Sequence, residues 1–387
     1  MHATSAARKT PRVRVRSVAQ SGTPRLMFDV DVARLVRSGQ VEADRADRVV
    51  WLWNEIRRLK RDKNAFVPAH NYQVPEVQAI ADTVGDSFEL AVRARDVKSR
   101  LVVFCGVRFM AEGCTTLAPD VPVYLPNQQA LCSLAEMDAD DLEERQEFLR
   151  SLGRKFATMT YVNTYASVKA LSDVCCTSSN AVKIADRLGV PDLLFVPDQN
   201  LAYQVALQTR RMYLPPPEPH QFHPREYLAR IEPLLREGER AGLVGNVFAW
   251  EGACHVHHQM TLADIAHIRQ EDPEAVVIVH GEVKPELQRA ADEVMSTSQM
   301  AKYVEGHPEK KRLAILTECG LVVRLELEHP DRQFYKPCRL CEHMKAITLE
   351  SVYETLRDEP AQCLVTVPED VRQRAAASML RMIDLGA

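Results

Sequence analysis

The chain of 387 residues lacks the features that mark several large classes of protein. No apolar run approaches the ~18 residues that a membrane-spanning helix requires, so we expect no membrane segment. The formal net charge of −4 argues against a general nucleic-acid or anionic-membrane surface. A secretory hydrophobic segment is also missing, so the ten cysteines are expected to stay reduced or to bind metal. These absences predict a cytoplasmic, multi-domain protein, and we expect an enzyme.

Acidic residues are absent from the first 28 residues, which carry Lys9 and five arginines. Such a composition can mark an organellar transit peptide. We favour a basic, disordered extension on a bacterial protein, since such tails are common. Residues 1–45 are therefore predicted to form an extension and lead-in to the folded chain.

Short apolar runs that end in polar residues occur as three sets of four, which is typical of buried parallel strands with functional carboxyl ends. The first set is "AFVPAHNY", "GDSFELA", "LVVFCGVRF" and "PVYLPNQQALC"; the second is "ATMTYVNTYA", "DVCCTSSNAV", "LLFVPDQNLAY" and "LVGNVFAWEGAC"; the third is "AVVIVHGEV", "EVMSTSQMAKY", "LAILTECGLVV" and "RQFYKPCRLC". Helical patterns separate the early strands of each set. This alternation predicts βαβ units with right-handed crossovers and one parallel sheet per set.

The spacing within the sets supports a repeat. Seventeen residues separate His70 from Ser87, Tyr161 from Ser178 and His280 from Thr297. The middle set is longer than the others by about 31 residues, and a proline-rich stretch followed by a helical one accounts for the excess. We therefore predict domains at 46–135, 136–256 (with an insertion near 205–240) and 257–345, followed by a C-terminal helical segment at 346–387.

Each of the three sets ends in a cysteine, and these are Cys132, Cys254 and Cys341. Ligands in parallel sheets bind beyond the carboxyl ends of the strands, so three related domains would bring these cysteines to one cavity. Three thiolates suit an iron–sulfur cluster. A four-iron cluster with three protein ligands keeps one open iron, which can act as a Lewis acid.

Other roles for cysteine remain open. Cys338 and Cys341 form a Cys-x2-Cys pair, but a zinc ribbon requires a second such pair, and a redox dithiol normally opens a helix after a first strand. A disulfide between Cys338 and Cys341 would remove Cys341 as a ligand and make cluster binding sensitive to oxidants. The cysteines in apolar runs are predicted to be small core residues, and they are Cys105, Cys175, Cys176, Cys319 and Cys363. No role is assigned to Cys114. A zinc site at His255, His257 and His258 is disfavoured because alternate residues of a loop rarely chelate a metal without a carboxylate ligand to complete the site.

Polar side chains occupy equivalent strand ends in the three sets. They are His70 and Tyr72, Tyr161 and Asn163, and His280 and Glu282. Imidazole, phenol, amide and carboxylate groups suit proton transfer beside carbonyls and imines. Hydroxyl groups follow at Ser87, Ser178, Ser296 and Thr297, where loops open into helices whose N-termini favour phosphate or carboxylate. The alternative is that these hydroxyls only cap their helices.

Eight blocks between about Ala65 and Glu350 resemble the quinolinate synthase family, in the family's order. The blocks are "AHNYQ", "GDSFELA", "GVRFMAE", "YVNTYASVKA", "CTSSNAV", "VPDQNLA", "WEGACHVH" and "CEHMKAITLE". The resemblance implies an α/β fold of three pseudo-threefold-related, three-layer αβα domains around one [4Fe–4S] cluster. It implies that Cys132, Cys254 and Cys341 ligate the cluster and that one iron stays open.

The resemblance also implies a reaction. The family condenses iminoaspartate with dihydroxyacetone phosphate to form quinolinate for NAD biosynthesis, with loss of phosphate and two waters. A separate L-aspartate oxidase supplies iminoaspartate. Family substrate contacts fall on His70, Tyr72, Ser87, Tyr161, Asn163, Ser178, His257, His280, Glu282, Ser296 and Thr297, and we expect Glu282, Tyr72 and His257 to be catalytic.

The sequence departs from the family pattern at a few positions. Gly281 stands where the family usually has proline, which predicts a looser loop around Glu282. Thr115 replaces a lysine, and Ala202 replaces a glycine. Two alternative functions stay open at this point: another [4Fe–4S] hydro-lyase, and a non-catalytic cluster-based sensor.

Overall fold

The computed structural model describes residue 28, residues 30–217 and residues 222–386. Most of the basic extension lies outside these described residues, so its predicted disorder is untested. Among the helices that are described, none is both long and apolar enough to cross a membrane.

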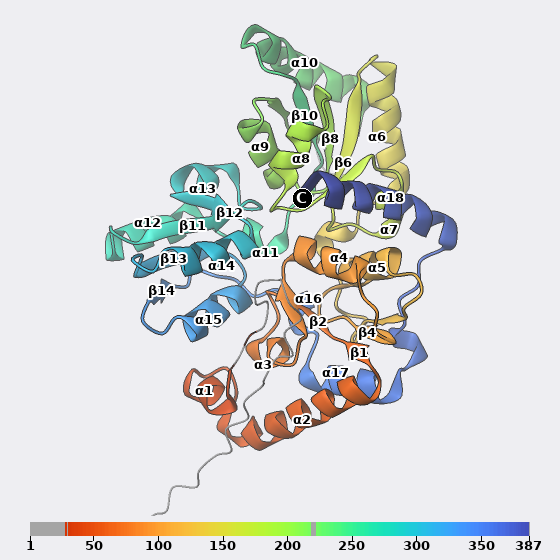
Figure 1. The fold of residues 1–387 in the computed structure, drawn as a ribbon. Coiled ribbons are helices and arrows are strands. Elements are labelled where there is room, and N and C mark those ends of the chain that lie inside the picture. Colours follow the sequence, from red (N-terminus) through yellow and green to blue (C-terminus); the bar gives the residue numbers. More distant parts are fainter. Residues whose placement is uncertain (1–27, 29, 218–221, 387) are drawn as a thin grey trace, which may run out of the picture.

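Parallel strands form the centre of the fold, in three groups along the chain (Figure 1). The strands are β1 (Ala65–Phe66), β2 (Pro68–His70), β3 (Thr83–Gly85), β4 (Leu101–Val103) and β5 (Val123–Tyr124); β6 (Phe156–Tyr161), β7 (Val174–Cys176), β8 (Asp192–Val196), β9 (Met212–Leu214) and β10 (Asn246–Ala249); and β11 (Val276–His280), β12 (Glu293–Met295), β13 (Arg312–Leu316) and β14 (Gln333–Tyr335). All the pairings between them are parallel.

The strand order recurs in the three groups. It is β7-β6-β8-β10-β9 in the second sheet and β12-β11-β13-β14 in the third. In the first group, β3 pairs with β2, and a bridge between Ala69 and Cys105 links this pair to the β1-β4-β5 sheet. The predicted α/β class with parallel sheets is confirmed. The predicted insertion supplies the extra strand β9.

Helices alternate with the strands as predicted. Within the three groups they are α3 (Pro75–Gln78), α4 (Ser87–Arg95) and α5 (Arg108–Leu117); α6 (Ala139–Ser151), α7 (Ala166–Ala170), α8 (Ala181–Arg187), α9 (Gln199–Gln208) and α10 (Pro224–Arg240); and α11 (His255–His258), α12 (Leu262–Glu271), α13 (Pro285–Ala290), α14 (Thr297–Gly306), α15 (Cys319–Glu328) and α16 (Glu342–Lys345). The described residues also form three short 3-10 helices: η1 (Ala43–Arg45), η2 (Ser133–Ala135) and η3 (Ala361–Cys363).

One predicted strand is wrong. The run "GDSFELA" is mainly helix α4, and the strand of this unit is the preceding β3. Asp86 accepts hydrogen bonds from the backbone N–H groups of Phe88 and Glu89, and the Glu89 side chain accepts one from the Asp86 N–H. This capping box starts the helix directly after the strand.

The two ends of the described chain are helical. They form α1 (Val32–Arg37), α2 (Ala46–Asp62), α17 (Leu349–Asp358) and α18 (Glu369–Gly386). Part of the predicted lead-in is therefore folded, and Leu35 on α1 is fully buried. Helix α17 packs on α2, and α18 packs on α7, β7, α8 and α5, so the C-terminal segment joins the first and second groups (Figure 1).

One contact between a side chain and the backbone repeats in the three groups. An aspartate that precedes the second strand accepts a hydrogen bond from the backbone N–H of the first strand or of the residue beside it: Val67 to Asp82 (2.8 Å), Thr158 to Asp173 (2.7 Å) and Val277 to Asp292 (2.8 Å). Each aspartate lies twelve residues after the polar residue that ends the first strand. Each crossover is thus tied to its sheet in the same way, which aligns the strand ends.

Candidate active site

Polar ends of β2, β6 and β11 face one cavity with about 670 Å³ of empty volume. Its wall includes most of the residues singled out from the sequence: Cys132, Cys254, Cys341, His70, Tyr72, Ser87, Tyr161, Asn163, Ser178, His280, Glu282 and Thr297. Two predicted residues are not part of the wall. His257 is fully buried behind it, and Ser296 caps α14 by accepting a hydrogen bond from the Gln299 N–H (3.3 Å).

Cys132, Cys254 and Cys341 each stand immediately before a short helical turn, at η2, α11 and α16. None of the three is in a disulfide. Burial raises the pKa of Cys132 to about 12 and that of Cys341 to about 11, and it raises the pKa of Cys254 well above its ordinary value. The free protein therefore holds these thiols protonated, and metal binding would release their protons. Three unpaired sulfur donors around one cavity fit an iron–sulfur cluster.

Cys338 forms a disulfide with Cys319, not with Cys341. The prediction that Cys319 is a simple core residue is wrong, and the suggested Cys338–Cys341 disulfide is not formed. The chain explains this pairing because Cys319 N–H donates to the carbonyl of Arg339 (3.1 Å), which brings the start of α15 beside the segment before Cys341. Cys341 remains free to act as a ligand.

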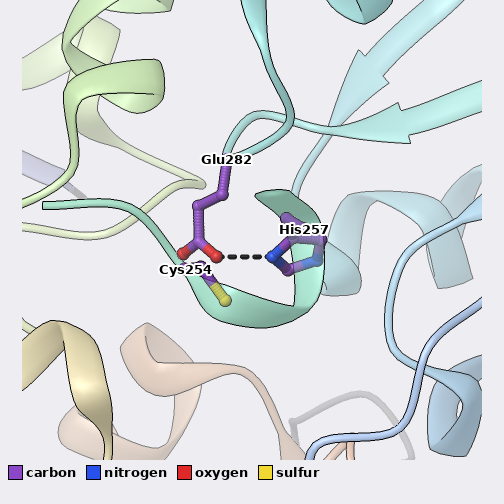
Figure 2. A group of neighbouring side chains, drawn as sticks. All are labelled: Cys254, His257 and Glu282. Atoms are coloured by element: carbon purple, nitrogen blue, oxygen red, sulfur yellow. Dashed lines mark hydrogen bonds and ion pairs between the residues drawn. The ribbon is translucent and has the colours of Figure 1, made fainter. Parts of the chain in front are cut away.

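A continuous chain of hydrogen bonds crosses the site. The Tyr161 hydroxyl donates to Glu282 Oε1 (2.5 Å), and Glu282 Oε2 lies 2.6 Å from His257 Nδ1 (Figure 2). His257 Nε2 lies 3.1 Å from Thr317 Oγ1, which lies 2.9 Å from the Tyr72 hydroxyl. The chain links groups that can give and accept protons from one side of the cavity to the other. Thr317 was missed from the sequence, although it directly follows β13 as the other polar residues follow their strands.

Burial and neighbouring groups set the protonation states of these residues. Burial lowers the pKa of both His70 and His280 to about 3, so both imidazoles are neutral near pH 7. Burial opposes ionisation of Glu282, but His280, His257 and the hydrogen bonds from His257 and Tyr161 outweigh it and hold the Glu282 pKa below its usual range. Burial raises the pKa of Tyr72 well above its usual value. The site thus offers an ionised carboxylate base beside a phenol that keeps its proton.

Three buried donors fix the loops that carry the polar residues, and none of the three was predicted from the sequence. Each donates to the carbonyl three residues after a strand-end residue: Gln78 to Gln73 (2.8 Å), Lys169 to Thr164 (2.7 Å) and Gln288 to Val283 (2.9 Å). The available signal was their constant offset, eight residues after His70, Tyr161 and His280. These contacts fix the three loops that follow β2, β6 and β11.

The loop around Glu282 is held firmly despite Gly281, contrary to the expectation of a looser loop. Gln288 donates to the carbonyl of Gly281 (2.9 Å), and Asn200 Nδ2 donates to the carbonyl of Glu282 (3.0 Å). A Cβ at Gly281 would lie 2.2 Å from Gln204 Oε1, so the Gln204 side chain occupies the space that a larger residue would need. Side-chain amides therefore replace the rigidity that proline would give.

The other departures lie away from the chemistry. Thr115 is not part of the cavity wall, and its hydroxyl donates to the carbonyl of Ala111 (3.2 Å) within α5. Ala202 is buried on α9.

Asn163 lines the cavity, and its buried Oδ1 has no hydrogen-bond partner in the described part of the chain. A buried amide oxygen without a partner favours a site that binds a ligand.

A second donor set overlaps the first. Cys254, His257 and Glu282 lie close together (Figure 2). One potential ligand atom from each of them, a sulfur, a ring nitrogen and a carboxylate oxygen, lies within 4.8 Å of the other two. Such a set would suit a single divalent ion. The three neighbouring histidines do not form a set of this kind, since His255 Nδ1 lies 3.1 Å from Ser133 Oγ and His258 is exposed. Iron and zinc content would distinguish a three-thiolate cluster from the mixed set.

Comparison with known proteins gives a consistent result across most of the chain. A family model described as "Quinolinate synthetase A protein" matches residues 54–384. The quinolinate synthase of Alkaliphilus metalliredigens is 39% identical over 336 residues, which cover 86% of this chain and 97% of that protein. That of Thermodesulfovibrio yellowstonii is 38% identical over 333 residues, covering 86% and 97%. Quinolinate synthase 1 of Mesorhizobium japonicum is 37% identical over 330 residues, covering 85% and 89%.

Proposed function

The chain belongs to the quinolinate synthase family, and we propose that it condenses iminoaspartate with dihydroxyacetone phosphate to form quinolinate for NAD biosynthesis. The reaction releases phosphate and two waters. The observation that carries this proposal is that three free thiols and a hydrogen-bonded chain from Tyr161 to Tyr72 meet at one cavity.

The proposed architecture is three αβα domains in pseudo-threefold arrangement, at residues 46–135, 136–256 and 257–345. The recurring strand order supports it, as do the aspartate contacts of the crossovers and the donors behind the strand-end loops. A domain repeat of this kind explains why one cysteine per domain reaches the same cavity.

Cys132, Cys254 and Cys341 would hold one [4Fe–4S] cluster per chain. When bound, the cluster would supply an open, Lewis-acidic iron to the substrate side of the cavity. The chain itself supplies the sulfur donors and the polar wall opposite them. The absence of a carboxylate among the three proposed ligands favours iron–sulfur binding over a hard cation.

Glu282, Tyr72 and His257 are the proposed catalytic residues. Ionised Glu282 would accept a proton next to a substrate carbonyl during the ketose–aldose tautomerisation, and Tyr72 would donate one during dehydration. His257 bridges them, because its ring contacts Glu282 through one nitrogen and lies within hydrogen-bonding reach of Tyr72 through the other (3.4 Å). Positions along one hydrogen-bonded chain allow the site to recover its starting protonation state after each turnover.

The substrates carry carboxylate and phosphate groups, for which the wall offers neutral donors and helix N-termini. Ser87 and Thr297 are the first residues of α4 and α14, where backbone N–H groups and the helix dipole favour anions. Asn163 and Ser178 come from the second group of strands. With His70, Tyr161 and His280, these residues are the proposed substrate contacts, while Ser296 acts through its cap on α14.

The test is product formation by protein purified without oxygen. Holoenzyme supplied with iminoaspartate and dihydroxyacetone phosphate is expected to produce quinolinate and phosphate in equal amounts. A cluster-containing protein that makes no quinolinate would leave the other hydro-lyase or the sensor function instead. A cytoplasmic location and supply of iminoaspartate by a separate L-aspartate oxidase are further proposals that follow from the pathway.

A further inference from the structure

Asp198 is a fully buried carboxylate that contacts the backbone of a proposed cluster ligand. Its Oδ1 accepts hydrogen bonds from the N–H groups of Asn200 (2.9 Å) and Leu201 (2.7 Å), which caps α9. Its Oδ2 accepts a hydrogen bond from the N–H of Cys254 (3.2 Å). One oxygen therefore caps the helix, and the other holds the cysteine.

Glu318 repeats this arrangement in the third group of strands. It is also fully buried, and its Oε2 accepts from the N–H of Gly320 (2.6 Å) at the start of α15. Its Oε1 accepts from the N–H of Cys341 (3.1 Å) and pairs with Lys345 Nζ at 2.7 Å. Lys345 in turn donates to the carbonyl of Tyr72, so the same carboxylate connects a cluster ligand to a catalytic loop.

The backbone around the two carboxylates is also equivalent. Isolated parallel bridges join Asp198 to Gly252 and Glu318 to Arg339, two residues before each cysteine. In the first group, Val107 occupies the N-cap position of α5, and its apolar side chain makes no capping hydrogen bond. Cys132 therefore has no carboxylate of this kind from its own group of strands. Buried acids thus hold two of the three proposed ligands, and within the described residues no acid holds the third in this way.

We propose that Asp198 and Glu318 are positioning residues for the cluster and that they orient Cys254 and Cys341 through their backbone N–H groups. A fixed N–H fixes the turn that follows each cysteine, and thus the direction in which its Sγ points. Mutation of groups that orient metal ligands commonly lowers metal affinity by roughly 10- to 100-fold.

Asp198→Asn and Glu318→Gln test this proposal with little change in volume. Asparagine still caps a helix well, so α9 is expected to persist in Asp198→Asn, while the oxygen that faces Cys254 is replaced or reoriented. Asp192→Asn is the matched control: Asp192 is buried on β8, accepts from the Asn246 N–H (3.1 Å) and pairs with Arg154, but it makes no hydrogen bond to a cysteine in the described part of the chain. The inference rests on the proposed cluster, so iron and sulfide in the wild-type protein are measured first.

The quantity measured is the rate at which an iron chelator removes the cluster under anaerobic conditions. The loss is monitored through the visible absorbance of the cluster. We expect the cluster to be lost about 10-fold faster or more in Asp198→Asn and Glu318→Gln, with the wild-type rate in Asp192→Asn. Denaturant unfolding of the cluster-free forms separates a positioning effect from general destabilisation. Glu318→Gln decides the question if Asp198→Asn does not fold.

Wild-type rates in both variants would overturn the proposal, and so would an equal acceleration in Asp192→Asn. A wild-type protein without any cluster would instead refute the proposed function, so the two failures are distinguishable.

Discussion

The buried ammonium of Lys169 occupies a position where the two equivalent units have glutamine. Its side chain is only 1% exposed, and Nζ donates to the carbonyls of Thr164 (2.7 Å) and Phe109 (3.4 Å). Burial lowers the pKa of Lys169, because the charged form is disfavoured away from water. A neutral amide that reaches Thr164 would keep the main contact and avoid that cost.

We therefore predict that Lys169→Gln is nearly neutral, whereas Lys169→Met is destabilising. Methionine matches the length of lysine but has no donor, so a charge-assisted hydrogen bond worth about 1.5–3 kcal/mol is lost. Part of this loss is offset because the buried charge is removed as well. The net change is expected at about 1–2 kcal/mol of unfolding free energy, and it should be absent or within ~0.5 kcal/mol in Lys169→Gln.

Denaturant unfolding of the cluster-free protein measures both variants, and quinolinate turnover reports on the Tyr161 loop that Lys169 supports. Lys169→Met is expected to lower turnover more than Lys169→Gln, since Thr164 lies three residues after Tyr161. Equal stability and turnover in the two variants would refute the view that these buried donors hold the loops that follow β2, β6 and β11.

Further predictions concern the acid–base chain, the disulfide and acid stability. Glu282→Gln should lower quinolinate turnover by about 10²- to 10⁴-fold with unchanged iron content; full turnover would exclude Glu282 as the base. Cys338→Ser should keep the wild-type iron content, because Cys338 pairs with Cys319, while unfolding free energy of the oxidised protein falls by about 2–4 kcal/mol; loss of iron would contradict this pairing. His70 has a folded pKa of about 3 against ~6.5 when unfolded, so the unfolded state binds more protons between these values. The unfolding free energy of the cluster-free protein should therefore fall as the pH drops from about 6.5 towards 3, and it should fall less steeply in His70→Gln. Denaturant unfolding of both proteins across this pH range tests the prediction.

The sequence predicted the parallel α/β class because buried apolar runs and equal spacings are local signals. It predicted the convergence of Cys132, Cys254 and Cys341 because each closes one set of runs, and all three reach the same cavity. The boundaries of helices and strands were predicted less accurately. The run "GDSFELA" looked like a strand because its apolar run is short, but the Asp86 capping box makes it the start of a helix.

Contacts between distant segments could not be read from the chain. The Cys319–Cys338 disulfide depends on the start of α15 lying beside the segment before Cys341, which no local pattern reveals. Thr317 joins His257 to Tyr72 only after helix α11 and the ends of β13 and β2 come together. Asp198 and Glu318 resemble ordinary helix caps in the sequence, and their second acceptor atoms gain meaning only from the cysteine that folds back onto each.

Iron and sulfide content of matched cysteine variants tests the central claim most directly. Anaerobically reconstituted wild-type protein, Cys132→Ser, Cys254→Ser and Cys341→Ser would be compared with Cys114→Ser and Cys338→Ser. The three-thiolate site predicts about four irons and four sulfides per chain in the wild type and in both controls, with a large loss in each of the other three variants. Retention of the full cluster in any of those three, or zinc in place of iron in the wild-type protein, would contradict the account.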